Sequence, residues 1–206
     1  MRLILIRHGQ TSSNIGHLLD TAPPGPPLTG LGHQQAGDLV STLSGEQITG
    51  IYVSDLVRTH QTAAPLAGHL DLPVVERGGL REIQAGNEEM ARYDPAAASP
   101  ADHHRYFHCL KAWVGGDLTA RIPGGETGHE FLERFDAVVA ELQAHHECAA
   151  AVSHGAALRV WCRHRCTNLG PHFLREAPMD NGQVNIVQGS ENRWRAVLWG
   201  DHPVPQ

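Results

Sequence analysis

Two histidines in this chain stand in the same local setting, each after a short apolar run and directly before a glycine. His8 follows the run at residues 3–6, and His154 follows the run at residues 149–152. A short apolar run that ends at a glycine is typical of a buried strand. In open α/β sheets, ligands bind at the carboxyl ends of the strands. The two histidines, with Arg7 beside the first, therefore indicate a site for an anion whose chemistry needs an imidazole.

Phosphoryl transfer is a reaction that these residue types could perform. It depends mainly on positioning and on neutralising the charge of three equatorial oxygens, and a guanidinium supplies a planar fork with a permanent charge. We predict that Arg7 and Arg58 clamp the phosphoryl group. We predict that His8 is the nucleophile, because a neutral imidazole can accept a phosphoryl group and two nearby guanidiniums would lower its pKa. Glu82 is the best candidate to give the leaving oxygen its proton.

Each of these residues also has a purely structural interpretation. A single histidine is more often a hydrogen-bonded core residue, Glu82 could be a solvated loop charge, and Arg58 could lie on a helix surface. A cation in the first turn of a helix opposes the helix dipole, which weakly favours a function for Arg58. His104 and His108 have the i, i+4 spacing of zinc ligands, but no H-E-x-x-H or paired C-x-x-C motif accompanies them. We therefore predict no metal site.

Strands and helices are predicted to alternate along the chain. Apolar residues at helical spacing mark four helices, around residues 36–43, 63–70, 131–142 and 158–165. Thr29 is a predicted N-cap for the first of them, and Ser54-Asp55 for the second. Further short strands are predicted at residues 51–53, 73–76, 184–187 and 194–199. The alternation predicts an α/β protein with a mainly parallel sheet and helices on both faces.

Residues 84–121 are the least regular part of the sequence, with only one helix-like piece, at residues 106–114. We interpret this stretch as an excursion from the sheet, since excursions of this length are commonly lids or substrate walls. Its aromatic and basic side chains are candidates for the wall of the site. They are Arg92, Tyr93, His103, His104, Arg105 and Tyr106.

Composition limits the class of protein further. The chain has 206 residues, of which 41% are hydrophobic and 18% charged, and this favours one domain over residues 1–206. The net charge of −6, without a run of like charges, argues against nucleic-acid or membrane-surface partners. No segment has the apolar length of a membrane span, and we expect a cytoplasmic protein. Its four cysteines lack C-x-x-C spacing, which favours reduced thiols.

Five short blocks occur in order between residue 3 and about residue 160. They are Arg7-His8-Gly9 with Thr11 and Asn14, Leu28-Thr29-x-x-Gly32, Ser54-x-Leu56-x-Arg58-Thr59-x-Gln61-Thr62-Ala63, Leu80-Arg81-Glu82-Ile83 and Val152-Ser153-His154-Gly155. Together they resemble the histidine phosphatase superfamily, the phosphoglycerate mutase-like group. The turn Gly124-Gly125-Glu126-Thr127 is similar to the Gly-Gly-Glu-Ser turn of that family.

The resemblance implies a fold, a mechanism and a set of site residues. The fold would be a three-layer α/β/α sandwich with one mostly parallel sheet. His8 would become phosphorylated, Glu82 would be the proton donor and then the base for the attacking water, and the phosphoryl group would be bound by Arg7, Arg58, His154 and Asn14. The family implies no metal and no nucleotide cofactor.

Departures from the family pattern favour a phosphatase over a mutase. In the mutase branch an Arg-His-Tyr-Gly-type stretch follows the catalytic glutamate and binds phosphoglycerate, whereas here residues 83–87 read Ile-Gln-Ala-Gly-Asn. Gln10 stands where glutamate is common, which removes a carboxylate near the nucleophile. Asp20 lies roughly where relatives place an amide or hydroxyl for phosphate contact, and its charge would repel an anion.

Three functions of different classes follow from this pattern. The preferred one is a metal-independent phosphatase that hydrolyses small phosphomonoesters through phospho-His8. The second is a phosphomutase, which would need a bisphosphate primer. The third is a non-catalytic domain that binds a phosphorylated ligand, although binding alone has no need of a proton donor such as Glu82. The aromatic terminal strand, residues 194–199, could be a covered edge or a homodimer contact.

Overall fold

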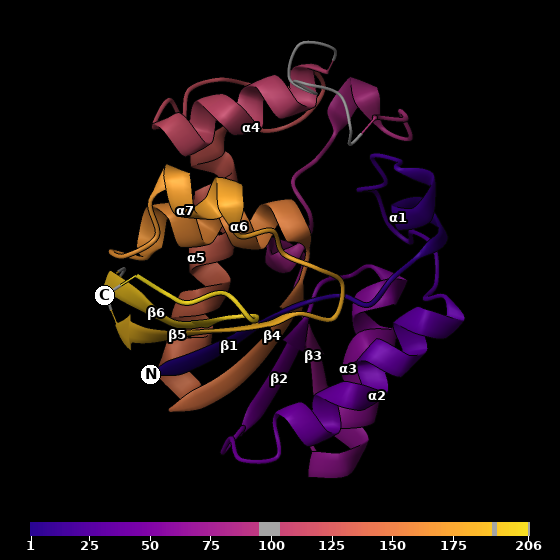
Figure 1. The fold of residues 1–206 in the computed structure, drawn as a ribbon, viewed down its shortest axis with the longest axis vertical. Coiled ribbons are helices and arrows are strands. Elements are labelled where there is room, and N and C mark those ends of the chain that lie inside the picture. The colour runs from indigo at the N-terminus through magenta and orange to yellow at the C-terminus, as the bar shows by residue number, and fades with distance from the viewer. Residues whose placement is uncertain (95–103, 191–192, 206) are drawn as a thin grey trace.

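The computed structural model describes residues 1–94, 104–190 and 193–205. A six-stranded sheet lies between two groups of helices (Figure 1). The strands are β1 (Arg2–Arg7), β2 (Gly50–Val53), β3 (Val74–Glu76), β4 (Cys148–Ser153), β5 (Val184–Ser190) and β6 (Arg193–Trp199). The helices are α1 (Ser12–Gly16), α2 (Gly30–Thr42), α3 (Val57–Leu70), α4 (Arg105–Gly115), α5 (Gly128–His145), α6 (Gly155–Arg165) and α7 (Pro171–Glu176), with short 3-10 turns η1 (Gly78–Leu80) and η2 (Gly86–Glu88). The predicted α/β sandwich is confirmed.

The strand order in the sheet is β3-β2-β4-β1-β5-β6. The first four strands of this order are parallel, whereas β5 and β6 are antiparallel. Only two residues separate the end of β5 from the start of β6, and a connection this short can join antiparallel strands but not parallel ones. The sheet is therefore mostly parallel, as predicted, and the exception is β5, which is antiparallel to both of its neighbours, β1 and β6.

Both faces of the sheet are buried, and this explains the continuous apolar runs in β1 and β4. Leu3 and Leu5 belong to a hydrophobic cluster with side chains of α5 and α6, whereas Ile4 and Ile6 belong to a second cluster with side chains of α2 and α3. Successive side chains of a strand point to opposite faces, so a strand covered on both faces shows no polar alternation. Among the described residues, no helix has the length and apolar character needed to cross a bilayer.

The predicted helix starts are partly confirmed. Thr29 is the N-cap of α2, and its hydroxyl accepts a hydrogen bond from the Gly32 amide. The predicted Ser54-Asp55 cap is wrong, because α3 is preceded by Leu56 and no side chain caps it. The two polar side chains have other partners. Ser54 contacts His154, and Asp55 forms an ion pair with Arg81.

The described part of the 84–121 excursion contains η2 and α4. The observed α4 corresponds to the predicted helical piece, and it packs against α6. Its side chains Tyr106, Cys109 and Trp113 are buried in the same cluster as the aromatic residues of α5. The excursion is thus attached to the core through α4. All four cysteines are buried and free, as predicted from their spacing.

Candidate active site

Strand register brings the two histidines together. In the parallel pair β1–β4, Arg7 lies opposite Ser153, so the next residue of each strand is a histidine at the same edge of the sheet. The His8 amide donates to the Ser153 carbonyl oxygen (3.0 Å), and the ring centroids of His8 and His154 are 5.1 Å apart. The pairing of two strands 146 residues apart in sequence therefore builds the centre of the site.

The His8 ring is arranged to be neutral with one free nitrogen. Its Nδ1 lies 2.7 Å from the Gly9 carbonyl oxygen, which can only accept, so Nδ1 carries the proton. Burial lowers the pKa of His8 well below its ordinary value, and the charges of Arg58 and Arg7 lower it further. A neutral imidazole of this tautomer has its electron pair on Nε2, the atom available for attack on phosphorus.

His154 lies behind His8 and is fully buried. Its Nε2 is 2.8 Å from Ser54 Oγ, whereas its Nδ1 has no partner among the described residues. Burial, and then the charge of Arg58, lower its pKa well below the usual range. His154 contacts the His8 ring, but it is not among the side chains that line the cavity. Its predicted contact with a phosphoryl group stays a prediction.

Arg7 and Arg58 have guanidinium atoms that the protein leaves unpaired. One nitrogen of Arg7 donates to the Met179 carbonyl oxygen, and one nitrogen of Arg58 donates to the Asp20 carbonyl oxygen (2.9 Å). Nε of Arg7 and both Nε and Nη1 of Arg58 are buried without a hydrogen-bond partner among the described residues. Burial lowers the pKa of both side chains. Buried cationic donors that lack partners are unfavourable, and an anion would satisfy them.

Asn14 and Asp20 line the same cavity. The Asn14 side-chain oxygen accepts from the Thr11 amide (3.0 Å) and from Asn181 Nδ2 (3.1 Å), which leaves its own Nδ2 for a ligand. Asp20 accepts from Ser13 Oγ (2.6 Å), and its other carboxylate oxygen lies 3.7 Å from Arg58 Nη1. The positive charge of Arg58 thus partly balances the negative charge of Asp20.

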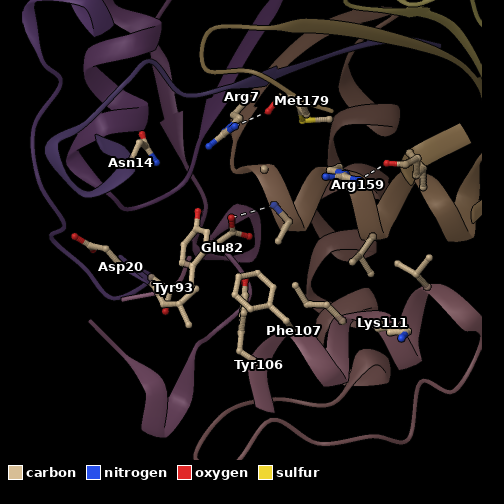
Figure 2. A pocket seen from close by; sticks show the side chains of 18 of the residues that line it. Arg7, Asn14, Asp20, Glu82, Tyr93, Tyr106, Phe107, Lys111, Arg159 and Met179 are labelled. Carbon is tan, nitrogen blue, oxygen red and sulfur yellow. Dashed lines mark hydrogen bonds between the residues drawn. The ribbon is translucent and has the colours of Figure 1, made fainter. Parts of the chain in front are cut away.

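The Glu82 carboxylate lies at the N-terminus of α6. Its Oε1 accepts from the amides of Ile83 (2.9 Å) and Ala157 (2.8 Å), and its Oε2 accepts from the Ala156 amide (3.1 Å). Because His154 immediately precedes α6, the helix that continues from the second histidine also fixes the carboxyl group. Figure 2 shows Glu82 in the centre of the cavity, between Arg7 and Tyr106.

A third arginine, Arg134, which the sequence did not single out, holds the segment that carries Glu82. Arg134 of α5 donates to the carbonyl oxygens of Gly79 (2.8 Å), Arg81 (2.8 Å) and Glu82 (3.1 Å). The same guanidinium forms a bidentate ion pair with Glu126, which is 6% exposed. In the sequence, Arg134 looks like one more charge on the solvated face of an amphipathic helix. Only its contacts show that it supports the site.

One cavity of about 1090 Å³ is lined by Arg7, His8, Asn14, Asp20, Arg58 and Glu82, and it extends well beyond them. Of the predicted wall residues, Tyr93 and Tyr106 line it, whereas Arg92, His104 and Arg105 do not. His103 lies outside the described residues. Sequence analysis also missed three cations of the lining, namely Lys111, Arg159 and Arg175. Arg159 could have been noticed, because it follows His154 by little more than one helical turn.

Metal ligands are not gathered at this site. Within the described ranges, no group of three or more His, Cys, Asp or Glu side chains is placed to hold a metal ion. The guanidinium groups of Arg7 and Arg58 line the cavity together with His8, and guanidinium groups bind anions.

Comparison with known proteins points to one family. A model of the histidine phosphatase superfamily (branch 1) matches residues 3–202. A probable phosphoglycerate mutase of Yersinia enterocolitica is 31% identical over 97% of this chain and 90% of its own length. A PE-PGRS family protein of Mycobacterium tuberculosis is 34% identical over 97% of this chain, which spans only 36% of that longer protein.

Two solved structures share both the fold and part of the sequence. A mycobacterial glucosyl-3-phosphoglycerate phosphatase in complex with VO3 has a TM-score of 0.78 and 27% identity, covering 97% of this chain and 98% of its own. An alpha-ribazole phosphatase of Shigella flexneri has a TM-score of 0.73 and 26% identity, covering 98% and 96%. Phosphatases and a mutase therefore both occur among the similar proteins.

Proposed function

The chain belongs to the histidine phosphatase superfamily (branch 1), as its sequence blocks predicted, and on this premise we propose that it is a metal-independent phosphatase. It hydrolyses small phosphomonoesters through a phosphohistidine intermediate on His8. The observation that carries the proposal is the set of buried guanidinium nitrogens without hydrogen-bond partners on Arg7 and Arg58, whose charges also lower the pKa of the His8 imidazole. An anion satisfies these donors, and the imidazole supplies a nucleophile at the same place.

In the first step, Nε2 of His8 attacks phosphorus while the bond from phosphorus to the ester oxygen breaks. Arg7, Arg58 and Asn14 hold the equatorial oxygens, and Glu82 gives its proton to the leaving oxygen, which departs as a neutral alcohol. We assign this proton to Oε2, because Oε1 already accepts two amide hydrogen bonds and Oε2 accepts one. The Gly9 carbonyl oxygen accepts from Nδ1 and disperses the positive charge of the phosphorylated ring.

In the second step, water attacks the phosphorus of phospho-His8. The Glu82 carboxylate removes a proton from the water, the new bond from oxygen to phosphorus forms, and the bond from nitrogen to phosphorus breaks. The electron pair of that bond returns to Nε2. Orthophosphate leaves, His8 is neutral again, and Glu82 carries the proton that the next cycle needs.

Hydrolysis is favoured over mutase chemistry by the segment after Glu82. Residues 83–87 contain no cation, and none of them lines the cavity. The names of the similar solved structures, a glucosyl-3-phosphoglycerate phosphatase and an alpha-ribazole phosphatase, also support hydrolysis. The name of the Yersinia relative keeps a phosphoglycerate mutase as the second candidate.

The proposal is tested with phenyl phosphate in the presence of EDTA. We expect release of phosphate by the wild-type protein and an acid-labile phosphoenzyme after rapid quenching. The variant His8→Gln should lose both, with kcat at least about a thousandfold lower, because the nucleophile is gone. His60→Gln is the matched control, since His60 is on α3 near Arg58 but is half exposed and paired with Glu76.

Two results would contradict the proposal. Activity that survives in His8→Gln would remove the phosphohistidine. Interconversion of phosphoglycerates with a bisphosphate primer, without net release of phosphate, would identify a mutase instead.

A further inference from the structure

The cavity continues from the phosphate end to a second group of cations. Arg159 comes from α6, Lys111 from α4 and Arg175 from α7, and all three line the cavity. In Figure 2, Arg159 and Lys111 lie on the side away from Asn14 and Asp20. Arg159 follows Gly155 by four residues, a rise of about 6 Å along the helix axis. Arg159 lines the same cavity as His8 and is close enough to Arg7 to feel its charge, so a ligand bound at His8 extends toward Arg159 with its leaving group.

Arg159 is a partly buried cation without an anionic partner. One of its nitrogens donates to the Leu174 carbonyl oxygen, and none of the ion pairs within the described ranges includes it. Burial lowers its pKa, and the nearby charge of Arg7 lowers it further. A desolvated guanidinium next to another cation is unfavourable until an anion arrives.

The protein's own carboxylates do not supply that anion. The acidic side chains that line the cavity among the described residues are Asp20 and Glu82. Asp20 is bound to Ser13 and lies beside Arg58, and Glu82 is held by backbone amides at the start of α6. Both belong to the phosphate end, so the counter-charge for Arg159 must come from a ligand.

Apolar side chains line the same cavity as the two groups of cations. They are Phe107, Leu110, Val114, Val160 and Leu174. An apolar wall with a few placed charges is the usual composition of a site for an organic ligand. A phosphate alone would leave this wall and the second group of cations empty.

We propose that the leaving group of the substrate has an apolar body and a second anionic group, a carboxylate or a second phosphate, and that Arg159 binds this group. The proposal rests on the proposed phosphatase function, whose phosphate end sets the position of the substrate. Arg159 is thus a specificity-determining residue, and Lys111 and Arg175 strengthen the positive potential around it. The preferred substrates are phosphomonoesters with two anionic ends.

The test compares three aryl phosphates that differ only at the para position. They are phenyl phosphate, 4-carboxyphenyl phosphate and 1,4-phenylene bisphosphate. In the wild-type protein, kcat/KM should be at least about tenfold higher for one or both of the compounds with a second anionic group than for phenyl phosphate. The reason is that these compounds gain a hydrogen bond between charged groups. Comparison of 4-carboxyphenyl phosphate with 1,4-phenylene bisphosphate shows whether a carboxylate or a phosphate is the preferred second anionic group.

The variant Arg159→Gln should remove this preference and leave kcat/KM for phenyl phosphate nearly unchanged. Arg163→Gln is the matched control, because Arg163 lies one turn further along α6, donates to the Val114 carbonyl oxygen (3.1 Å) and does not line the cavity. It should keep the wild-type preference. Equal loss for all three compounds in Arg159→Gln would show a purely structural role and overturn the proposal, as would the absence of any preference in the wild-type protein.

A binding measurement separates failure of this inference from failure of the proposed function. In the His8→Gln variant, calorimetry with the same three compounds should show that a compound with a second anionic group binds more tightly than phenyl phosphate. The double variant His8→Gln, Arg159→Gln should bind all three compounds equally. If the wild-type protein hydrolyses none of them but this binding preference is present, the phosphatase function fails and the second anion site stands. Equal binding of all three compounds would overturn the second anion site.

Discussion

At the level of single residues, the site depends on a histidine whose surroundings exclude a second positive charge. Burial has the largest effect on the pKa of His8, and Arg58 and Arg7 add to it. The same two guanidiniums that would bind a phosphoryl group thus also favour the unprotonated form of His8, the proposed nucleophile. Binding and activation are two effects of one arrangement of charges.

A single guanidinium is expected to position Glu82. Replacing Arg134 by lysine keeps the charge beside Glu126 but cannot make all the bonds to the carbonyl oxygens of Gly79, Arg81 and Glu82. We expect kcat for phenyl phosphate to fall by up to about a hundredfold, because Glu82, the proposed proton donor, moves, and we expect a smaller change in KM. Steady-state kinetics with phenyl phosphate measure both quantities.

Arg165→Lys is the control for this substitution. Arg165 pairs bidentately with Asp136, which lies on the same helix as Arg134, but away from the cavity. It should lower stability without changing kcat. A kcat for Arg134→Lys equal to that of the control would show that the Arg134 contacts only stabilise the fold.

At the level of elements, the position of His8 depends on how closely the end of β1 approaches the start of α2. A side-chain carbon on Gly32 would lie 2.3 Å from the Gln10 carbonyl oxygen, and one on Gly9 would lie 2.6 Å from the Gly32 carbonyl oxygen. Backbone atoms on both sides leave no room for a methyl group. This contact explains why the block Leu28-Thr29-x-x-Gly32 matters for a site that it does not enter.

Gly32→Ala should therefore separate the two elements. We expect a loss of about 1–3 kcal/mol in the free energy of unfolding, as in other overpacked sites, together with lower kcat/KM because His8 shifts. Gly37→Ala, on the same helix with no atom within 4 Å of the added carbon, should instead raise stability by up to about 1 kcal/mol. Urea denaturation and kinetics on both variants check this, and equal effects of the two substitutions would refute it.

At the level of the whole molecule, the buried neutral histidines link stability to pH. The pKa values of His8 and His154 are lowered well below the ordinary value in the folded state. As pH falls below about 6.5, the unfolded chain gains protons that the folded protein cannot bind, so the free energy of unfolding decreases. The stability is fully present above the unfolded pKa and is lost as pH falls toward the folded values.

This link between protonation and folding predicts that the free energy of unfolding of His8→Gln decreases less at acid pH than that of the wild-type protein. Each such histidine contributes up to about 1.4 kcal/mol per pH unit below pH 6.5, so the variant should lose less stability between pH 7.5 and pH 5 than the wild-type protein. Urea denaturation in buffers free of phosphate measures this. His33→Gln, at an exposed position of α2, is the control and should keep the wild-type slope. A slope in His8→Gln equal to that of the control would disprove the linkage.

The local parts of this protein can be predicted from its amino-acid sequence. Apolar runs and helical spacing predicted the strands and helices, and the two histidine-glycine blocks predicted which strand ends meet, because these patterns report on burial over a few residues. Residues with a characteristic block around them, such as His8, Arg58 and Glu82, could be selected in the same way. The structure places them in one cavity, and their catalytic roles stay predictions.

Which isolated charges belong to the site depends on how distant segments pack, and the sequence pattern does not show this. Arg134, Arg159 and Lys111 lie on helices, where a charged residue normally indicates a solvated face. Arg134 contacts the segment that carries Glu82, whereas Arg159 and Lys111 line the cavity. The same reason explains the Ser54-Asp55 error, since both side chains have long-range partners in place of a helix cap. A local pattern shows that a side chain is polar, but packing of distant segments determines what it contacts.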